Sequence, residues 1–384
     1  MASYLSALGV LFQPVNFIMM YICSLVGCVL GAIPGLSGGL GITLILPMTF
    51  ALNTNLSFAM LLGMYVGGVS GSFIAAVLVG IPGSAASIGT CYDGYPMTQK
   101  GQAARALSIG ITGSFIGTLV SILVATFCST FIADVALKLG PWEYFSLCLM
   151  AITMVVGLSK GSIFKGLLAA FFGLWLSTVG SDMVTNQLRF TFHNTNLYGG
   201  INVVCLLMGT FALQQVASSY AKNNLTMPEV DAGSLKGFGF SFKDFKDNLK
   251  VIITSLFIGL WIGFLPGMGS GISNLMAYGQ AKKMSKYPEK FGTGIDEGIW
   301  ATEVANNAGV GGAIIPMIAL GIPGDGTTVL LMSAMTIHGL QAGPMFIKNN
   351  PLLANLIFAT VLIAAILIFV TELLTKHWFP MLLK

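Results

Sequence analysis

The sequence predicts an all-α, polytopic membrane protein, built as an inverted-topology repeat whose helices are broken at proline–glycine pairs. Composition is the first reason: 55% of the 384 residues are hydrophobic, 8% are charged, and the mean hydropathy is +0.84. Soluble domains carry roughly a quarter charged residues, so this composition excludes a soluble fold. The other reasons are a series of long apolar segments and the recurrence of the breaks in both halves of the chain.

Long apolar segments predict the membrane helices, since a helical crossing of the bilayer needs roughly 20 residues. We expect them at 14–33, 37–52, 58–80, 105–131, 142–158, 161–180, 201–220, 251–265, 272–281, 299–320, 327–337 and 352–373. Several are too short to cross, and these flank the proline–glycine pairs, which is typical of re-entrant or discontinuous helices. The first segment is expected to be an uncleaved membrane helix, because no basic residues precede it.

Hydrophilic residues divide the chain into three predicted parts. Residues 1–220 form a first membrane repeat unit with the spans that follow it, residues 221–250 a cytoplasmic linker, and residues 251–384 a shortened second unit. Lysines place the linker and the loop at 282–298 inside, whereas the counterpart loop at 53–55 is uncharged. Equivalent loops with opposite charge bias indicate inverted units, with the N-terminus outside and the C-terminal tail inside.

The first break, at residues 31–41, interrupts a run that should continue as a helix. Pro34 removes a backbone donor there, and the clustered glycines make helix propagation costly. A twin lies in the second half of the chain, where Pro266 corresponds to Pro34 and introduces a second glycine-rich stretch at 266–271. A bilayer tolerates such a break only where the freed backbone groups face protein or a wet cavity.

A second break also occurs twice. Gly80-Ile81-Pro82-Gly83 recurs in the second half as Gly321-Ile322-Pro323-Gly324. The residues that follow differ, because Ser84 in the first half corresponds to Asp325 in the second. Breaks at corresponding places in two halves are the best sequence pointer to a transporter binding site.

The glycine-rich breaks predict an anion site. Glycines leave backbone N–H groups accessible and helix starts bear partial positive charge, so such loops suit a carboxylate or a phosphate. The predicted substrate-binding residues are Gly35, Leu36, Ser37, Gly38, Gly39, Ser84, Ser87, Gly267, Gly269, Ser270, Gly271, Asn306, Thr327 and Thr328. The alternative is close helix packing through small residues, without a ligand.

An acidic residue deep in an apolar region predicts a cation site, because a charge there is expensive. The predicted ligands of a coupling Na⁺ are Asp325, Asn307 and Glu303, since small hard cations take oxygen ligands. Two alternatives stay open: Asp325 caps the following half-helix, or Glu303 and Asn307 join helices together. For Tyr65, the positional equivalent of Asn306, a packing role is favoured over the donation of one hydrogen bond to a substrate.

Neither a resident metal nor an organic cofactor is expected. The six cysteines are scattered without a CxxC pair, and the three histidines show no metal-ligand spacing. The net charge of +4 lies in loops and therefore reports topology, not a nucleic-acid partner. The lipid bilayer is the partner that composition alone predicts.

At these stretches the chain resembles the TctA family, the large membrane subunit of the tripartite tricarboxylate transporters. The resembling segments are Gly31–Phe50, Gly80–Leu107, Gly140–Gly180, Gly263–Gly279, Glu303–Gly312 and Gly321–Phe346. The resemblance implies uptake of tri- or dicarboxylates across the bacterial inner membrane by symport with Na⁺ or H⁺, without ATP. It also implies a small membrane subunit and a periplasmic solute-binding protein as partners. Family members often read Pro-Gly-Leu-Gly where Ser37 and Gly38 stand here, and they usually continue for several more spans.

Two alternative functions compete with transport. Asp93 and Asp325 resemble the paired aspartates of intramembrane aspartyl proteases, whose chemistry needs both carboxylates to share one water and one proton. Against this, Asp93 is expected in a cytoplasmic polar turn, and Pro323 breaks the expected Gly-x-Gly-Asp spacing. The second alternative is a membrane scaffold or sensor that does not transport.

Overall fold

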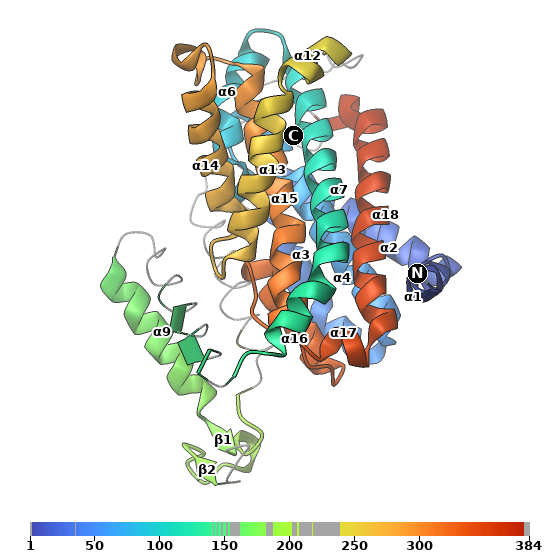
Figure 1. The fold of residues 1–384 in the computed structure, drawn as a ribbon, viewed down its shortest axis with the longest axis vertical. Helices are drawn as coiled ribbons and strands as arrows, with labels where there is room; N and C mark the ends of the chain where they lie inside the picture. Colours follow the sequence, from blue (N-terminus) through green and yellow to red (C-terminus); the bar gives the residue numbers. More distant parts are fainter. Residues whose placement is uncertain are drawn as a thin grey trace.

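The computed structural model describes residues 2–34, 36–140, 162–181, 187–201 and 239–379, with isolated positions between 142 and 217 (Figure 1). The α-helices are α1 (Ala2–Leu11), α2 (Pro14–Ala32), α3 (Gly38–Ile45), α4 (Thr54–Gly71), α5 (Phe73–Val79), α6 (Ile88–Gln99), α7 (Ala103–Ala136), α9 (Ile163–Ser177), α12 (Phe242–Asp247), α13 (Leu249–Phe264), α14 (Gly269–Met284), α15 (Asp296–Leu320), α16 (Gly326–Ile337), α17 (Phe346–Asn349) and α18 (Pro351–Thr375). The 3₁₀ helices are η1 (Leu46–Ala51), η2 (Ala85–Ser87), η3 (Thr195–Leu197), η6 (Pro288–Lys290) and η7 (Lys376–Trp378). Strands β1 (Gly180–Ser181) and β2 (Leu188–Arg189) pair antiparallel.

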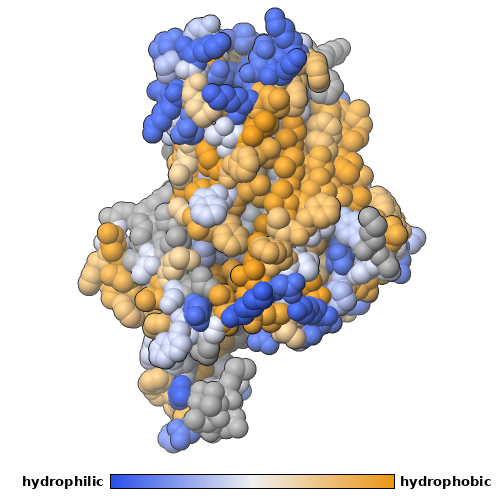
Figure 2. Space-filling view, in the orientation of Figure 1, coloured by the Kyte–Doolittle hydropathy of each residue, from blue (hydrophilic) through white to orange (hydrophobic). Residues whose placement is uncertain are grey.

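The predicted all-α membrane class is confirmed. Among the described residues, four helical stretches are long and apolar enough to cross a membrane: Pro14–Ala32, Thr54–Val79, Ala103–Ala136 and Pro351–Trp378. Figure 2 shows a broad apolar band on one face, below a hydrophilic cap at the end where α12 lies. Such a band matches the surface that a bilayer covers.

Most predicted segments correspond to helices, and the main correction concerns α6. Asp93 was expected in a polar turn, but it lies inside α6 and its side chain is buried. Its carboxylate can be buried because four donors reach it, three of them backbone N–H groups of residues 292–295. The predicted segments 142–158 and 201–220 lie almost entirely outside the described residues, as does 221–238 of the predicted linker.

Equivalent close contacts recur in the two halves of the chain. A Cβ on Gly27 of α2 would overlap the carbonyl oxygen of Met64 on α4. Gly259 of α13 is the counterpart of Gly27, and a Cβ on it would overlap the carbonyl oxygen of Ala305 on α15, the counterpart of Met64. Small residues thus let the backbones of α2 and α4 meet, as they do for α13 and α15.

The two halves are interleaved and not side by side. α7, from the first half, packs along α15, whereas α18, from the second, packs against α2 and α4. α15 therefore lies in the interior, and every residue from Gly298 to Ala319 is buried. Separate apolar cores surround its first and second halves.

The half-helices that follow the breaks point to two different ends of the molecule. His338, just after α16, lies 3.4 Å from the Thr54 hydroxyl at the start of α4, so α16 and the α3–η1 segment end together. At the other end, Lys100 after α6 donates to the carbonyl of Thr293, in the loop that follows α14. Figure 1 shows α6 and α14 towards one end and α16 and α17 towards the other.

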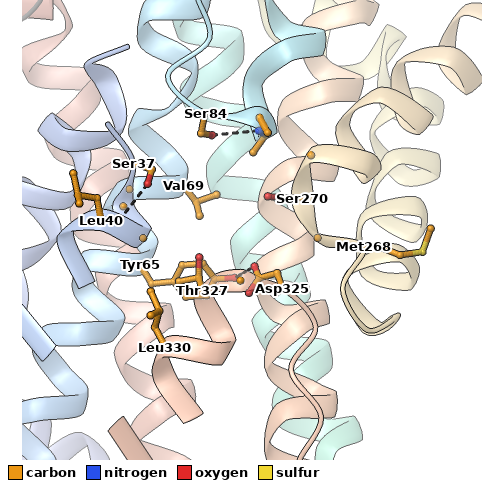
Figure 3. A pocket seen from close by; sticks show the side chains of 18 of the residues that line it. Ser37, Leu40, Tyr65, Val69, Ser84, Met268, Ser270, Asp325, Thr327 and Leu330 are labelled. Atoms are coloured by element: carbon orange, nitrogen blue, oxygen red, sulfur yellow. Dashed lines mark hydrogen bonds between the residues drawn. The ribbon is translucent and has the colours of Figure 1, made fainter. Parts of the chain in front are cut away.

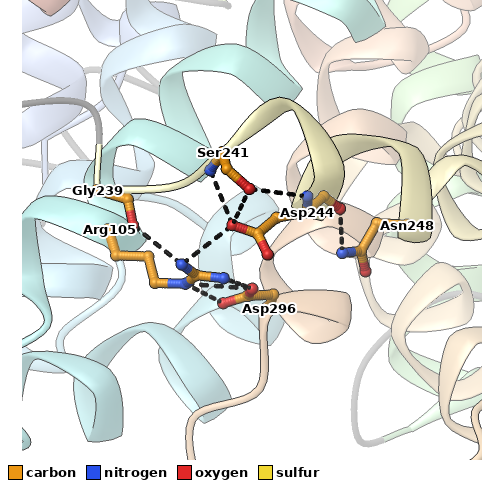
Figure 4. Close-up of polar contacts among 6 residues, drawn as sticks. All are labelled: Arg105, Gly239, Ser241, Asp244, Asn248 and Asp296. Carbon is orange, nitrogen blue, oxygen red and sulfur yellow. Dashed lines mark hydrogen bonds and ion pairs between the residues drawn. The ribbon is translucent and has the colours of Figure 1, made fainter.

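A charged network ties residues before α12 to both halves (Figure 4). Arg105 at the start of α7 donates to Asp296 and to the carbonyl of Gly239, both at 3.0 Å, and lies 3.3 Å from Asp244. The Ser241 backbone N–H and hydroxyl also donate to Asp244, and together with Arg105 they lower the pKa of this carboxyl below its usual value.

Candidate functional site

Four helix starts surround one cavity of about 330 Å³ (Figure 3). They belong to α3, to η2 with the α6 that continues it, to α14 and to α16, so each of the four predicted breaks contributes one. The described lining residues are Ser37, Gly38, Gly39, Leu40, Tyr65, Gly68, Val69, Ser84, Ala85, Ala86, Gly267, Met268, Gly269, Ser270, Gly271, Asp325, Gly326, Thr327 and Leu330.

Ser37 is the N-cap of α3, and its Oγ accepts a hydrogen bond from the Leu40 N–H at 3.2 Å. Gly38 approaches α4 so closely that a Cβ would lie 2.6 Å from the Cα of Gly68, which fixes the start of α3. At Gly39, by contrast, a Cβ would lie 3.6 Å from the nearest side-chain atom. The first N–H groups of a helix have no partner within the helix, so this start offers donors to the cavity.

Ser84 caps η2 in a reciprocal arrangement. Its Oγ accepts from the Ala86 N–H at 3.3 Å, and its own N–H donates to Ser87 Oγ at 3.4 Å. Ser87 is consequently buried in the cap and does not line the cavity, although it was predicted to bind substrate. A capping box of this kind fixes where the helix begins.

The start of α14 depends on two glycines with left-handed backbone. Gly267 has φ of 76° and Gly269 of 62°, a region that side chains disfavour. The Gly267 N–H donates to the carbonyl of Gly324 at 3.0 Å, which joins the two breaks of the second half. Figure 3 shows Ser270 on the cavity wall opposite Ser37.

Asp325 caps α16, as the alternative interpretation of this residue proposed. Its Oδ1 accepts from the Thr328 N–H at 2.7 Å and from the Thr328 hydroxyl at 2.9 Å. Its Oδ2 accepts from the Tyr65 hydroxyl at 2.8 Å. Thr328 is buried within this cap and does not line the cavity, whereas Thr327 does.

Tyr65 is the lining residue that sequence reasoning set aside. It lies on α4, is almost fully buried, and points across the cavity wall to Asp325. The available signal was its alignment with Asn306, a polar residue in the matching helix of the other half. No lysine, arginine or histidine belongs to the described lining, in which Asp325 is the single acidic residue.

The predicted cation ligands are not brought together. Glu303 is buried between helices, where its carboxylate accepts from the hydroxyls of Thr90 and Ser114. Asn307 lies one turn further along α15, and its Oδ1 accepts from Thr118 at 3.2 Å. Neither lines the cavity that Asp325 faces, and no described group of three or more acidic, histidine or cysteine residues suits a metal ion.

Two further predicted substrate residues, Asn306 and Leu36, do not belong to the described lining of the cavity. Asn306 is fully buried near Glu303, and neither atom of its amide meets hydrogen-bond geometry with a described residue. Leu36 is half-buried beside the cavity lining without belonging to it. Gly35 lies outside the described residues.

The two aspartates of the protease alternative have separate partners. Asp93 Oδ1 accepts from the N–H groups of Gly292, Gly294 and Ile295, and its Oδ2 from the Tyr278 hydroxyl. Asp325 instead bonds to Tyr65 and to its own cap. An acid pair that shares a proton is therefore absent from these two positions.

Comparison with known proteins identifies the family. The model of the tripartite tricarboxylate transporter TctA family matches residues 17–384. An uncharacterized 52.8 kDa protein in the TAR-I ttuC' 3' region of Agrobacterium vitis is 34% identical over 370 residues, which cover 96% of this chain and 73% of the relative. An uncharacterized protein in the TAR-II ttuC' 3' region of the same organism is 35% identical over 125 residues, 32% of this chain and 52% of that relative. No solved structure matches the chain.

The family match bears on the enzyme alternative. Its members are transporter subunits and not enzymes, so the aspartyl protease hypothesis is wrong. The family match and the relative that matches over nearly the whole chain together establish the family of this chain. The chain belongs to the tripartite tricarboxylate transporter TctA family.

Proposed function

We propose that this chain is the large subunit of an ion-coupled secondary transporter that takes tri- or dicarboxylates across the bacterial inner membrane. A periplasmic solute-binding protein would deliver the substrate, and a small membrane subunit would complete the complex. Membership of the TctA family supports the transporter role and the carboxylate class. The convergence of four helix starts on one cavity is the observation that carries the proposal.

The helix starts suit an anion because each carries about half a positive charge. Four of them around one cavity supply about two positive charges in total, set against the one carboxylate of Asp325 and without a basic side chain among the described lining residues. The hydroxyls of Ser37, Ser84, Ser270 and Thr327 add donors on different walls of the same cavity. Carboxylates of a di- or tricarboxylate would therefore bind backbone N–H groups and hydroxyls.

Asp325 supports the coupling to a cation. Two like charges about 4 Å apart repel by about 4 kcal/mol in a partly screened protein environment. A substrate carboxylate near Asp325 would meet this repulsion unless Na⁺ or H⁺ entered with it. Because such a cation lowers the cost of substrate binding, and the substrate lowers the cost of cation binding, the two would be transported together.

The arrangement of the half-helices supports an inverted repeat and alternating access. α3 and α14 start at the same cavity and run to opposite ends, as do α6 and α16. α3 and α16 pack on a first body, which is formed with α2, α4 and α18. η2 and α14 pack on a second body, which is formed with α6 and α15. Movement of one body against the other would open the cavity to each side in turn.

Gly39→Ala tests the carboxylate site. The new methyl group would lie 3.6 Å from Ser37 Oγ and 3.9 Å from Thr327 Oγ1, so it fits without a clash and yet intrudes on the cavity. The matched control is Gly279→Ala in α14. Gly279 is also a helical glycine, and a Cβ on it would meet nothing within 4 Å. Uptake of citrate would be measured in cells that carry the complete transporter, together with thermal stability of the purified chain.

We expect Gly39→Ala to reduce citrate uptake at least about tenfold, because a small misplacement in a binding site commonly has effects of this size or larger. Gly279→Ala should transport like the parent chain, and both variants should keep its melting temperature. Normal uptake by Gly39→Ala would contradict the proposed site. Binding of the solute-binding protein without any citrate uptake would instead support the scaffold alternative.

A further inference from the structure

The Tyr65 hydroxyl has one proton to donate, and in this structure it donates it to Asp325 Oδ2 at 2.8 Å. Tyr65 also lines the cavity, so the same hydroxyl lies within the wall that a bound carboxylate would touch. Two acceptors, Asp325 and the substrate, would therefore compete for one donor.

The other oxygen of Asp325 does not take part in this competition. Oδ1 is held by the backbone N–H and the hydroxyl of Thr328, both within the N-cap of α16. Only Oδ2 depends on a residue from another element, because Tyr65 comes from α4. Oδ2 is thus the oxygen whose partner can change while the cap stays intact.

We propose that Tyr65 is the positioning residue that couples cation and substrate, by switching its hydroxyl from Asp325 Oδ2 to a substrate carboxylate when a cation occupies Asp325. The inference rests on the proposed carboxylate and cation sites. With the cavity empty, the hydroxyl satisfies Asp325 and makes its oxygen a poorer cation ligand. A cation at Oδ2 releases the hydroxyl, which then becomes a donor for the substrate. Each ligand therefore prepares the site for the other, in a reciprocal way.

The test compares Tyr65→Phe with a matched tyrosine–aspartate pair elsewhere in the chain. Tyr65→Phe removes the hydroxyl and keeps the ring, so packing is preserved. The control is Tyr278→Phe, because the Tyr278 hydroxyl donates to Asp93 Oδ2 at 2.9 Å and that carboxylate keeps three backbone donors. Citrate and Na⁺ affinities of the purified full chain would be measured by titration calorimetry, each with and without the other ligand, with choline replacing Na⁺.

The change in Na⁺ affinity distinguishes the proposed switch from a purely structural role of Tyr65. A structural role predicts weaker Na⁺ binding in Tyr65→Phe, and the switch predicts stronger binding. Tyr65→Phe should raise the affinity for Na⁺ in the absence of citrate by about tenfold, because a hydrogen bond to a charged group need no longer be broken. The factor by which Na⁺ improves citrate binding should fall about tenfold in the same variant, since the coupling is reciprocal. Tyr278→Phe should leave both quantities unchanged.

Two outcomes would overturn the inference alone: parental coupling in Tyr65→Phe, or the same loss of coupling in Tyr278→Phe. A parent chain that binds no citrate, or binds it without regard to Na⁺, would overturn the proposed function and this inference with it. The parental measurement therefore separates the two failures.

Discussion

Ser84 and Asp325, at corresponding positions of the two halves, cap equivalent helix starts in the wall of the same cavity. Each forms a capping box with the residue three positions later, Ser87 in the first half and Thr328 in the second. The two caps thus share a geometry and differ in charge. This difference makes the cavity asymmetric, and it places the acidic group on the second half alone among the described lining residues.

Asp325→Asn should abolish the dependence of citrate uptake on Na⁺. Asparagine caps helices about as well as aspartate, so the free energy of unfolding should change by only a few tenths of a kcal/mol. The amide oxygen can take the place of Oδ1 and keep the bond from the Thr328 N–H, while the amide NH₂ in the place of Oδ2 can donate to the Tyr65 hydroxyl oxygen. The negative charge is then removed and the cap is kept. Uptake at saturating and at zero Na⁺ would be compared, and Asp134→Asn at the surface is the matched control.

Persistent Na⁺ dependence in Asp325→Asn would show that the coupling cation binds elsewhere. Equal loss of Na⁺ dependence in Asp134→Asn would point to a general effect of net charge. A large fall in the melting temperature of Asp325→Asn would show that the cap needs the carboxylate. A loss of Na⁺ dependence in that variant would then reflect instability and not the loss of a cation ligand.

Gly324→Ala should destabilise the chain, because a Cβ there would overlap the carbonyl oxygen of Gly263 and lie 2.6 Å from the Cα of Ala313. Both neighbours are backbone atoms, which cannot rotate away. Overpacking of this kind typically costs about 1–3 kcal/mol. The matched control is Gly309→Ala, a buried helical glycine whose Cβ would meet nothing closer than 3.7 Å.

Thermal unfolding of the purified variants would distinguish the two glycines. Gly324→Ala should unfold at a lower temperature than the parent chain, and Gly309→Ala at the same or a higher temperature. Equal effects at both positions would contradict the close packing around the second break.

Asn306 and Asn307 are adjacent on α15, yet they should respond oppositely to replacement by leucine. Asn306 is buried with neither amide atom hydrogen-bonded in proper geometry, and a buried unpaired polar group costs about 1–3 kcal/mol. Asn307→Leu would instead remove the bond to the carbonyl of Glu303 and the acceptor of two hydroxyl donors, Ser70 and Thr118.

We therefore expect Asn306→Leu to stabilise the chain by about 1 kcal/mol and Asn307→Leu to destabilise it by about 1–3 kcal/mol. Chemical denaturation in detergent measures both. Because both variants introduce leucine, each serves as the control for the effect of its size and shape in the other. Destabilisation by both would mean that Asn306 has a partner in the folded chain.

The breaks were predictable because proline and glycine act on the local backbone. Pro34 and Pro266, each next to glycines, follow the ends of α2 and α13, and similar offsets in sequence align the breaks of the two halves. The helix starts at Gly38 and Gly326 therefore fall close to the predicted positions. All four helix starts meet at one cavity because the two halves of the chain are interleaved.

The roles of individual polar residues were less predictable, because they depend on distant partners. Asp93 looked like a turn residue, but Gly292 and Gly294 supply donors from across the chain and allow it to be buried in α6. Neighbouring helical positions point about 100° apart, so spacing alone did not show that Glu303, Asn306 and Asn307 of α15 lie outside the cavity lining. Tyr65 was expected in a packing role because its hydrogen-bond partner, Asp325, lies 260 residues further along the chain.

Arg105→Ala should loosen the segment before α12. Arg105 joins Asp296, Asp244 and the carbonyl of Gly239, so its loss removes several charge-assisted bonds at once. Its side chain is 28% exposed, and solvent screening limits the expected destabilisation to about 1 kcal/mol. Lys348→Ala, which removes an exposed surface ion pair with Asp134, is the control and should have almost no effect.

The effect of Arg105→Ala should depend on pH, since the native pKa of Asp244 lies below its usual value. A carboxyl with a lowered native pKa stabilises the fold at pH above the unfolded-state pKa, and the contribution disappears as pH falls through the native pKa. The difference in melting temperature between parent and variant should therefore be largest near neutral pH and shrink under acid. Limited proteolysis between residues 239 and 247 should follow the same trend, and a difference that grows on acidification would contradict the assignment of this network.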